Sequence, residues 1–190
     1  PIEEGKFHWE NYNVETTLDW EGLRKDVLTN GVANSMYNTQ MPTATSAQMN
    51  SSTESYENLT SNVYSRRVNA GDYTVINKYL IRDLEKIGVW GDDFSRDLIM
   101  ADGSVQMLNI YDYKESPTQS DIDYFNKIKT IYKTVWEVSQ KSRTNICIAM
   151  QPFIDQAISM NTFYKTPTIG GWGSALFYAW KNGLKTGSYY

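Results

Sequence analysis

Apolar side chains recur every three to four positions in several parts of the chain. The spacing after Asp19 continues as far as Asn30-Gly31, so it predicts a helix that Asp19 caps. The same spacing follows Asn77 and ends at Gly88, which predicts a second helix. A shorter helix is expected over residues 92–100.

The longest periodic segment begins at Ser120, where Ser120 and Asp123 have the spacing of a capping box. Its apolar and small residues fall on one face: Ile122, Phe125, Ile128, Tyr132, Val135, Ser139, Ser142, Ile146 and Ala149. We therefore expect one long helix from Ser120 to Ala149. Pro152 breaks this pattern and is expected to open another helix that extends to Asn161.

Strand-like segments are short and few. Residues 63–68 and 73–76 contain β-branched and aromatic side chains and flank Asn69-Ala70-Gly71-Asp72, which we expect to form a turn. A further short strand is expected within residues 32–41, around Met36-Tyr37. Because helices dominate and strands are interspersed among them, the predicted fold class is α/β.

A last helical pattern lies near the end of the sequence and contains Leu176, Phe177, Trp180 and Leu184. Gly170-Gly171-Trp172-Gly173 comes just before it. This run is too short for a dinucleotide-binding fingerprint and lacks the strand that should precede one, so no such role is expected.

Length and composition favour one substantial domain. The 190 residues include 14 Tyr and 6 Trp, whose half-polar side chains suit contact with another chain. The net charge of −4 comes without long blocks of like charge, so neither nucleic acid nor a membrane is an expected partner. No apolar run approaches the roughly 20 residues that span a bilayer, and no signal peptide opens the sequence. A cytoplasmic protein is expected.

Residues that carry most enzyme chemistry are scarce. Cys147 is the only cysteine and His8 the only histidine, so no internal disulfide and no metal site are expected. Cys147 lies among aliphatic residues and is expected to be a core residue. Glu54 and Asp155 are candidates for buried polar partners, but neither has a second carboxylate with which to form an acid–base pair.

A candidate phosphate site lies at residues 42–48. A proline followed by small residues predicts a helix start, where the first backbone N–H groups lack helical partners and the dipole's positive end faces outward. The hydroxyls of Thr43, Thr45 and Ser46 can add donors. An ordinary capped helix explains the same pattern, and the sequence alone does not distinguish the two.

Two adjacent tyrosines, Tyr189 and Tyr190, end the sequence after a glycine that releases the chain from the last helix. A phenol that loses an electron near neutral pH must also lose its proton, because its normal pKa is about 10. Two rings held face to face can pass a radical from one to the other. The alternative is that both are packing or interface aromatics.

Five blocks of the sequence resemble, in the same order, the large subunit of class I ribonucleotide reductase. They are PTATSAQ at 42–48, TSNVYSRRV at 60–68, YKTVWEVSQK at 132–141, FIDQ at 153–156, and GLKTG at 183–187 before the two tyrosines. The resemblance extends from residue 1 to residue 190 and corresponds to the carboxyl-terminal portion of that subunit. The sequence is similar to phage versions, some of which are split between genes. The resemblance therefore implies a class Ia, phage-type large subunit, of which this chain is either a piece or a separate split-gene product.

The resemblance implies a fold and a reaction. That family folds as a ten-stranded α/β barrel, and this chain would form its later portion with a small α/β insertion at about residues 64–130. The barrel would be incomplete without its upstream half. The family reduces ribonucleoside diphosphates to deoxyribonucleoside diphosphates by radical chemistry.

The resemblance also implies roles for individual residues. The segment that holds the substrate's diphosphate, chiefly through backbone N–H groups, corresponds to Thr43, Ala44, Thr45 and Ser46. Tyr189 and Tyr190 correspond to the paired tyrosines that relay a radical from the small subunit to an active-site cysteine. By this analogy Tyr189 is nearer that cysteine and Tyr190 nearer the subunit interface.

The rest of the family's active site lies upstream, and Cys147 matches none of its catalytic cysteines. The implied partners are therefore an upstream fragment that carries those cysteines, a small subunit with a diiron–tyrosyl radical, a second copy of the assembled large subunit, and nucleoside diphosphates. The implied reductant is a dithiol protein, thioredoxin or glutaredoxin. The alternative is a non-catalytic fragment that assembles with or stabilises a reductase complex.

Overall fold

The computed structural model describes residues 17–34 and 36–189, and the chain divides into two compact units. The continuous unit is Glu57–Val138. The discontinuous unit combines Pro1–Tyr56 with Ser139–Tyr190. No helix in the described part of the chain is long and apolar enough to cross a bilayer.

The continuous unit begins with a β-hairpin. β1 (Val63–Val68) pairs antiparallel with β2 (Gly71–Ile76), and the register places Val68 opposite Gly71. The predicted hairpin is confirmed, with β2 starting earlier than expected. Gly71 has a φ of 136°, which a residue with a side chain rarely adopts, so glycine suits the point where the chain reverses.

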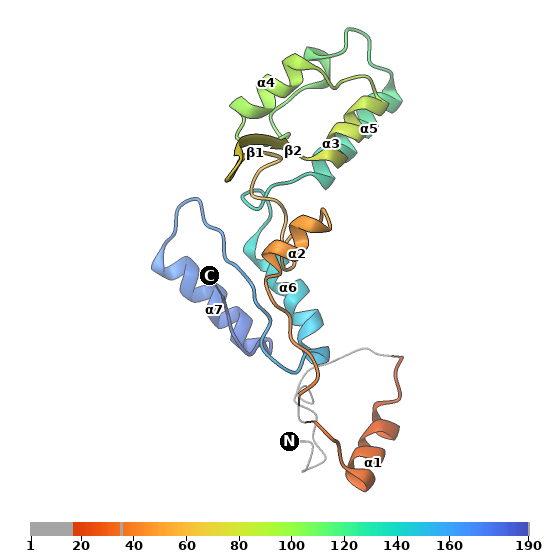
Figure 1. Cartoon of the computed structure of the whole chain (residues 1–190), viewed down its shortest axis with the longest axis vertical. Helices are drawn as coiled ribbons and strands as arrows, with labels where there is room; N and C mark the ends of the chain where they lie inside the picture. Colours follow the sequence, from red (N-terminus) through yellow and green to blue (C-terminus); the bar gives the residue numbers. More distant parts are fainter. Residues whose placement is uncertain (1–16, 35, 190) are drawn as a thin grey trace. The chain divides into compact units, whose positions relative to one another are not determined.

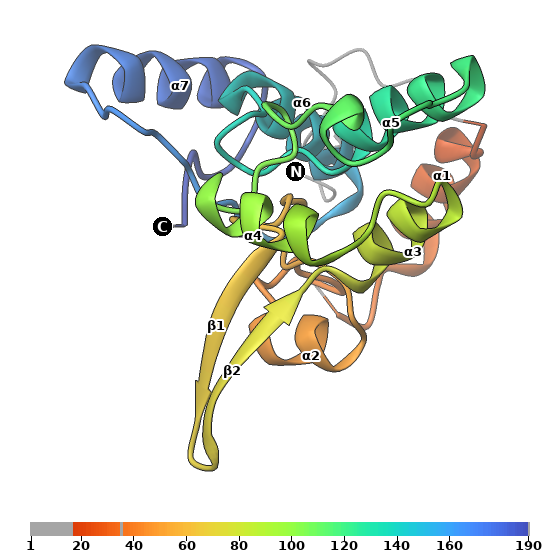
Figure 2. The same cartoon turned by 90° about the horizontal axis from the view of Figure 1, so that it is seen from above.

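Helical elements follow the hairpin in this unit. They are α3 (Lys78–Lys86), α4 (Asp92–Met100), the 3₁₀ turn η2 (Ile110–Asp112) and α5 (Gln119–Ile131). The predicted helices after Asn77 and at residues 92–100 are confirmed, and Asn77 caps α3 by accepting a hydrogen bond from Tyr79 N (3.1 Å). Helix α3 packs beside α5 (Figure 1), and Figure 2 shows the hairpin turn extending away from both.

These elements enclose one hydrophobic core. Its buried residues are Leu80, Leu84, Ile87, Val89, Phe94, Leu98, Val105, Leu108, Ile110, Phe125 and Ile128. The ring of Phe94 is fully buried and lies 4.8 Å from the Tyr113 ring and 6.4 Å from the Phe125 ring. Val63 and Ile76, at the base of the hairpin, pack against the same core. Each element therefore turns its apolar face toward one interior.

The start of α5 differs from the prediction. Thr118 caps the helix, because its hydroxyl accepts a hydrogen bond from Asp121 N (3.2 Å) while the Asp121 carboxylate accepts one from Thr118 N (2.9 Å). The predicted pair of Ser120 and Asp123 lies two residues too late. Thr118 follows Pro117 and has an extended backbone, which suits the residue that precedes a helix.

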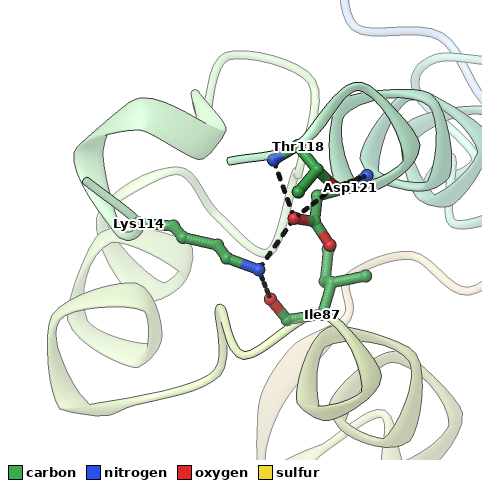
Figure 3. A network of polar contacts seen from close by, with 4 residues as sticks. All are labelled: Ile87, Lys114, Thr118 and Asp121. Carbon is green, nitrogen blue, oxygen red and sulfur yellow. Dashed lines mark hydrogen bonds and ion pairs between the residues drawn. The ribbon is translucent and has the colours of Figure 1, made fainter. Parts of the chain in front are cut away.

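A lysine completes this cap. Lys114 Nζ donates to the Asp121 carboxylate (2.8 Å) and to Ile87 O (2.9 Å), so it joins the start of α5 to the end of α3, as Figure 3 shows. The hydrogen bond from Lys114, followed by those from Thr118, lowers the pKa of Asp121 to about 2.

The predicted single helix over residues 120–149 is wrong. Helix α5 ends at Ile131, and a separate helix, α6 (Gln140–Met150), begins after Ser139 in the discontinuous unit. The predicted face is buried along α5, where Phe125 and Ile128 lie in the core of the continuous unit, but Ser142, Ile146 and Ala149 on α6 are exposed. Helix α6 instead buries Cys147, which is not part of that pattern.

Backbone contacts explain the break between α5 and α6. Asn62 Nδ2 donates to Tyr132 O (2.9 Å), and Val135 N donates to Leu59 O (3.0 Å). A continuous helix would use both backbone groups for its own hydrogen bonds. Residues distant in sequence take these groups instead, and a periodic pattern cannot reveal such contacts.

The discontinuous unit is mainly helical. Its elements are α1 (Trp20–Asn30), α2 (Ala44–Met49), α6, the 3₁₀ turn η3 (Gln151–Phe153) and α7 (Ile169–Lys181). Asp19 caps α1 by accepting a hydrogen bond from Gly22 N (2.9 Å), which confirms that prediction. The last predicted helix is confirmed as α7, although Leu184 lies beyond its end. The buried core residues are Cys147, Ile154, Ile158, Met160, Ala179 and Leu184.

Two predicted elements of this unit do not form. Only the short turn η3 follows α6 in place of the helix expected from Pro152 to Asn161. No strand forms around Met36-Tyr37; within residues 36–41 the only strand-like pairing is a parallel bridge between Gln40 and Ile158. The expected helix fails because the amides of Gln156 and Ser159 donate to Asn38 O and Gln40 O, which are distant in sequence, and not to carbonyls one helical turn back.

The described residues do not form a closed barrel. They contain one sheet, made of β1 and β2, and the parallel bridge just described. The mixture of helices and strands agrees with the predicted α/β class. The ten-stranded barrel stays a prediction for the assembled protein. The expected insertion at residues 64–130 lies within Glu57–Val138 and also stays a prediction.

Candidate functional site

Asp155 binds the chain just ahead of the predicted phosphate segment. Its Oδ2 accepts hydrogen bonds from the backbone N–H groups of Tyr37 (2.6 Å) and Asn38 (3.1 Å). The Asn38 side chain accepts a bond from Asp155 N (2.8 Å) and donates one to Phe153 O (2.9 Å). Asp155 is therefore a half-buried polar partner, engaged with backbone groups.

Backbone pairing continues from there toward Pro42. Gln156 N donates to Asn38 O (3.4 Å), and Ser159 N donates to Gln40 O (3.0 Å). The two segments run parallel, as the bridge at Gln40 shows. This pairing fixes where the chain enters the turn that precedes α2.

The turn into α2 has an unusual backbone. Thr43 is the residue before the helix and has a φ of 60° and a ψ of 30°, the left-handed conformation that β-branched residues rarely adopt. Its hydroxyl donates to Pro42 O (2.6 Å), which also accepts a bond from Ser55 N (3.1 Å). Strain of this kind occurs preferentially at functional sites, so Thr43 marks a position to test.

The first amides of α2 precede its helical hydrogen bonds. Ala47 N donates to Thr43 O (2.7 Å), so the N–H groups of Ala44, Thr45 and Ser46 come before the first helical bond. Residues 43–46 are exposed, whereas Ala47 is buried and anchors the helix. Because α2 has only 6 residues, the individual amides and hydroxyls, more than a helix dipole, are what it can offer an anion.

The tail beyond α7 contacts the same region as residues 37–40. Lys185 Nζ donates to Ile154 O (3.3 Å) and to Asp155 O, and Lys185 N donates to Gln151 Oε1 (3.4 Å). Residues 153–160 therefore support both segments that the sequence singled out: the approach to Pro42 and the tail that ends in two tyrosines.

Tyr189 is held by its backbone and presents its ring to solvent. Tyr189 N donates to Met160 O (2.6 Å), while the residue is 65% exposed. Gly187 passes so close to α7 that a Cβ there would lie 2.4 Å from Leu176 Cδ2. Tyr190 lies outside the described residues, so the arrangement of the two rings stays a prediction.

The remaining candidate residues have plainer roles or lie outside the described residues. Cys147 is buried in the hydrophobic core, as expected. Burial, and then the nearby Cys147, raise the pKa of Tyr56. Glu54 is half-buried, and His8 lies outside the described residues. Within residues 17–34 and 36–189, no three His, Cys, Asp or Glu side chains group to hold a metal ion.

Sequence reasoning missed three residues of this site: Asn38, Gln151 and Lys185. Each hydrogen-bonds to a residue that is distant in sequence, which a local pattern does not predict. The largest distance along the sequence is 117 positions, from Asn38 to Asp155. A glutamine directly before a proline or a lysine between two glycines carries no recognised signal of its own. Only the fold brings these residues together.

Comparison with known proteins places this geometry in context. A family profile described as the ribonucleotide reductase barrel domain matches residues 1–190. The chain is 40% identical over 195 residues to the ribonucleoside-diphosphate reductase large subunit of Acanthamoeba polyphaga mimivirus. It is 40% identical over 192 residues to large chain 2 of that enzyme in Saccharomyces cerevisiae, and 38% identical over 192 residues to the large subunit in Caenorhabditis elegans. These alignments cover 100% of this chain but only 21% to 23% of each relative.

Proposed function

The chain belongs to the barrel-domain family of ribonucleotide reductase large subunits, and we propose that it supplies two parts of a reductase active site. One part is the loop that holds the substrate's phosphates, and the other is a tyrosine relay for a radical. The observation that carries this proposal is that residues 153–160 support both segments. The chain spans about a fifth of its relatives' length, and the proposal assigns the catalytic thiols to the upstream region.

The phosphate loop binds the diphosphate of a ribonucleoside diphosphate. Its binding residues are Thr43, Ala44, Thr45 and Ser46. The support for this role is that these residues are exposed and that three of their amides precede the helical hydrogen bonds of α2. The hydroxyls of Thr45 and Ser46 add neutral donors to the charged oxygens.

The hydroxyls of the loop give a direct test of this role. Thr45→Ala and Ser46→Ala each remove one donor and leave the backbone amides in place. Each is expected to raise KM for the nucleoside diphosphate about two- to tenfold with kcat retained, the loss expected for one hydrogen bond. Thr53→Ala, at an exposed threonine outside the loop, is the matched control. An unchanged KM in both loop variants would remove the hydroxyls from the binding site.

The tyrosine pair conducts a radical toward the substrate. The radical of the small subunit takes an electron and the phenolic proton from Tyr190, Tyr189 restores Tyr190 in the same way, and an upstream cysteine thiol restores Tyr189 and is left as a thiyl radical. Each transfer moves one electron and one proton, because a protonated phenol radical is strongly disfavoured near neutral pH. The exposed ring of Tyr189 leaves room for a partner surface to approach.

The proposal names a class I enzyme with several partners. A small subunit holds the diiron centre that supplies the radical, and the assembled large subunit pairs with a second copy. A dithiol protein, thioredoxin or glutaredoxin, restores the upstream cysteines after turnover. The upstream region is supplied by the same polypeptide or by a separate one, as in a split phage reductase. The complex works in the cytoplasm, which is the host cytoplasm for a viral protein.

Reconstitution tests the proposal. This chain is mixed with the upstream region of the large subunit, a diiron small subunit, a dithiol reductant and a ribonucleoside diphosphate, and deoxyribonucleoside diphosphate is measured. We expect product only when all components are present. Omitting the upstream region should abolish it, because this chain lacks the catalytic thiols. Absence of product from the complete mixture, with each component folded and the small-subunit radical present, would refute the proposal.

A further inference from the structure

Gln151 is a buried polar side chain whose contacts join two segments. It is 5% exposed, and its Nε2 donates to Ile154 O (3.1 Å) and to Gln156 O (3.0 Å). Its Oε1 accepts a hydrogen bond from Lys185 N (3.4 Å). Burying an amide is costly unless its donors and acceptor are paired, and here all of them are. The side chain thus connects residues 154–156 to the start of the tyrosine tail.

Lys185 makes the reciprocal contact with its side chain. Its ammonium donates to Ile154 O (3.3 Å) and to Asp155 O. Gln151 and Lys185 therefore converge on one carbonyl, that of Ile154. Hydrogen bonds from an ammonium are stronger than those from a neutral amide, so Lys185 contributes more than a loose surface contact.

We propose that Gln151 and Lys185 form a positioning clamp for the tyrosine relay. The inference rests on the proposed function, because it assigns a purpose to the placement of Tyr189. Neither clamp residue touches a reacting atom. The clamp fixes where the tail leaves residues 153–156, and the bond from Tyr189 N to Met160 O (2.6 Å) continues that placement to the tyrosine itself.

Asp155 contacts the two segments through different groups. Its backbone carbonyl binds Lys185, whereas its carboxylate binds the amides of Tyr37 and Asn38 ahead of the phosphate loop. Loss of the Lys185 side chain therefore removes support from the relay and leaves the contacts of the loop in place. The clamp should affect the radical step and spare substrate binding.

Lys185→Met tests the clamp in the complete large subunit assembled with its small subunit. The variant keeps the length of the side chain and removes its charge and its donors. Because Lys185 is exposed, the protein is expected to fold. We expect kcat to fall at least about tenfold with KM for the nucleoside diphosphate within about twofold, since small misplacement of reacting groups can cost up to about 100-fold in rate.

Hydrogen exchange gives a readout that does not depend on turnover. The Tyr189 amide should exchange about tenfold faster in Lys185→Met than in the parent protein, because local opening becomes easier. Lys185→Arg keeps a charged donor and should restore part of both properties. Lys165→Met, at an exposed lysine in the loop before α7, is the matched control and should change neither. Gln151→Glu, which keeps the acceptor and loses the donors, should also speed exchange.

The outcomes separate the clamp from the proposed function. Unchanged exchange at Tyr189 in Lys185→Met would overturn the clamp, and so would a loss of activity that appeared only in KM. Full turnover by Tyr189→Phe would instead refute the relay itself, whatever the exchange rates. Faster exchange and lower kcat in Lys185→Met, both partly restored by Lys185→Arg, would support the clamp.

Discussion

Thr43 has a left-handed backbone conformation that glycine adopts without strain. Its φ of 60° places it where side chains with a branched Cβ are disfavoured. Thr43→Gly should therefore be neutral or stabilising by up to about 1 kcal/mol, once the greater flexibility of glycine in the unfolded chain is counted. Urea unfolding of the two proteins measures the difference.

A second glycine substitution in the same segment should have the opposite sign. Thr45 lies within α2, where glycine is a poorer helix former, so Thr45→Gly should cost about 0.3–0.5 kcal/mol. Equal destabilisation by the two substitutions would mean that Thr43 is not strained. Because the proposed phosphate donors are mainly backbone amides, Thr43→Gly should also retain binding of the nucleoside diphosphate.

Asn62 is a buried side chain whose hydrogen-bonding groups are all engaged. Its Nδ2 donates to Gly103 O (2.9 Å) and Tyr132 O (2.9 Å), and its Oδ1 accepts from Asn77 Nδ2 (3.0 Å). Asn62→Ala leaves these partners without their hydrogen bonds and should lower the free energy of unfolding by about 1–3 kcal/mol. Asn69→Ala, at the exposed hairpin turn, should change the free energy of unfolding by less than about 0.5 kcal/mol. Similar effects of the two would show that the Asn62 contacts contribute little.

Helix α5 begins at a cap that depends on pH. The pKa of Asp121 is lowered to about 2, so its ionised form is favoured in the folded protein. The resulting stability is present above about pH 4 and is lost as the pH falls toward 2. The free energy of unfolding of the parent protein should therefore approach that of Asp121→Asn across this range, measured by urea unfolding at several pH values.

Lys114 is the control for this prediction, because it is the first cause of the lowered pKa. Lys114→Met removes the ion pair and leaves Thr118 in place. In the Lys114→Met background, the free energy of unfolding with and without Asp121→Asn should therefore differ less in its dependence on pH. A difference between parent and Asp121→Asn that is constant from pH 2 to pH 5 would contradict the assignment.

The elements that the sequence predicted correctly are those whose boundaries have local causes. Asp19 and Asn77 cap the helices that follow them, and the turn at Asn69-Ala70 joins two short strands. The end of α5 has no such local signal, since Leu59 and Asn62 decide it from far along the sequence. The periodic pattern predicts the buried face of α5 correctly, at Phe125 and Ile128, but fails beyond the break, where Ser142, Ile146 and Ala149 are exposed.

The candidate site shows the same division. The exposed start of α2 after Pro42 and the position of Cys147 in the core followed from local composition. The contact from Asp155 to residues 37–38 and the two contacts of Lys185 did not, because they depend on how distant segments pair. The residues of the proposed loop and relay come from a family resemblance, whereas the structure identifies the segment, residues 153–160, that contacts both.

The molecule as a whole consists of two units, each with its own core. The chain enters the continuous unit after Tyr56 and returns at Ser139, so the candidate site belongs to the discontinuous unit alone. That unit has one isolated parallel bridge among its described residues and no complete sheet. Unpaired strand edges normally require a cover, so we expect this unit to pair with the upstream region of the large subunit.

Turnover by the assembled enzyme with Tyr189→Phe is the most direct test of the relay. The substitution keeps the ring and removes the phenolic O–H, so it should stop coupled electron and proton transfer with little loss of packing. We predict that formation of deoxyribonucleoside diphosphate falls to background while binding of the ribonucleoside diphosphate is retained. Tyr111→Phe, at another exposed tyrosine, should retain full activity. Undiminished turnover by Tyr189→Phe would contradict the account.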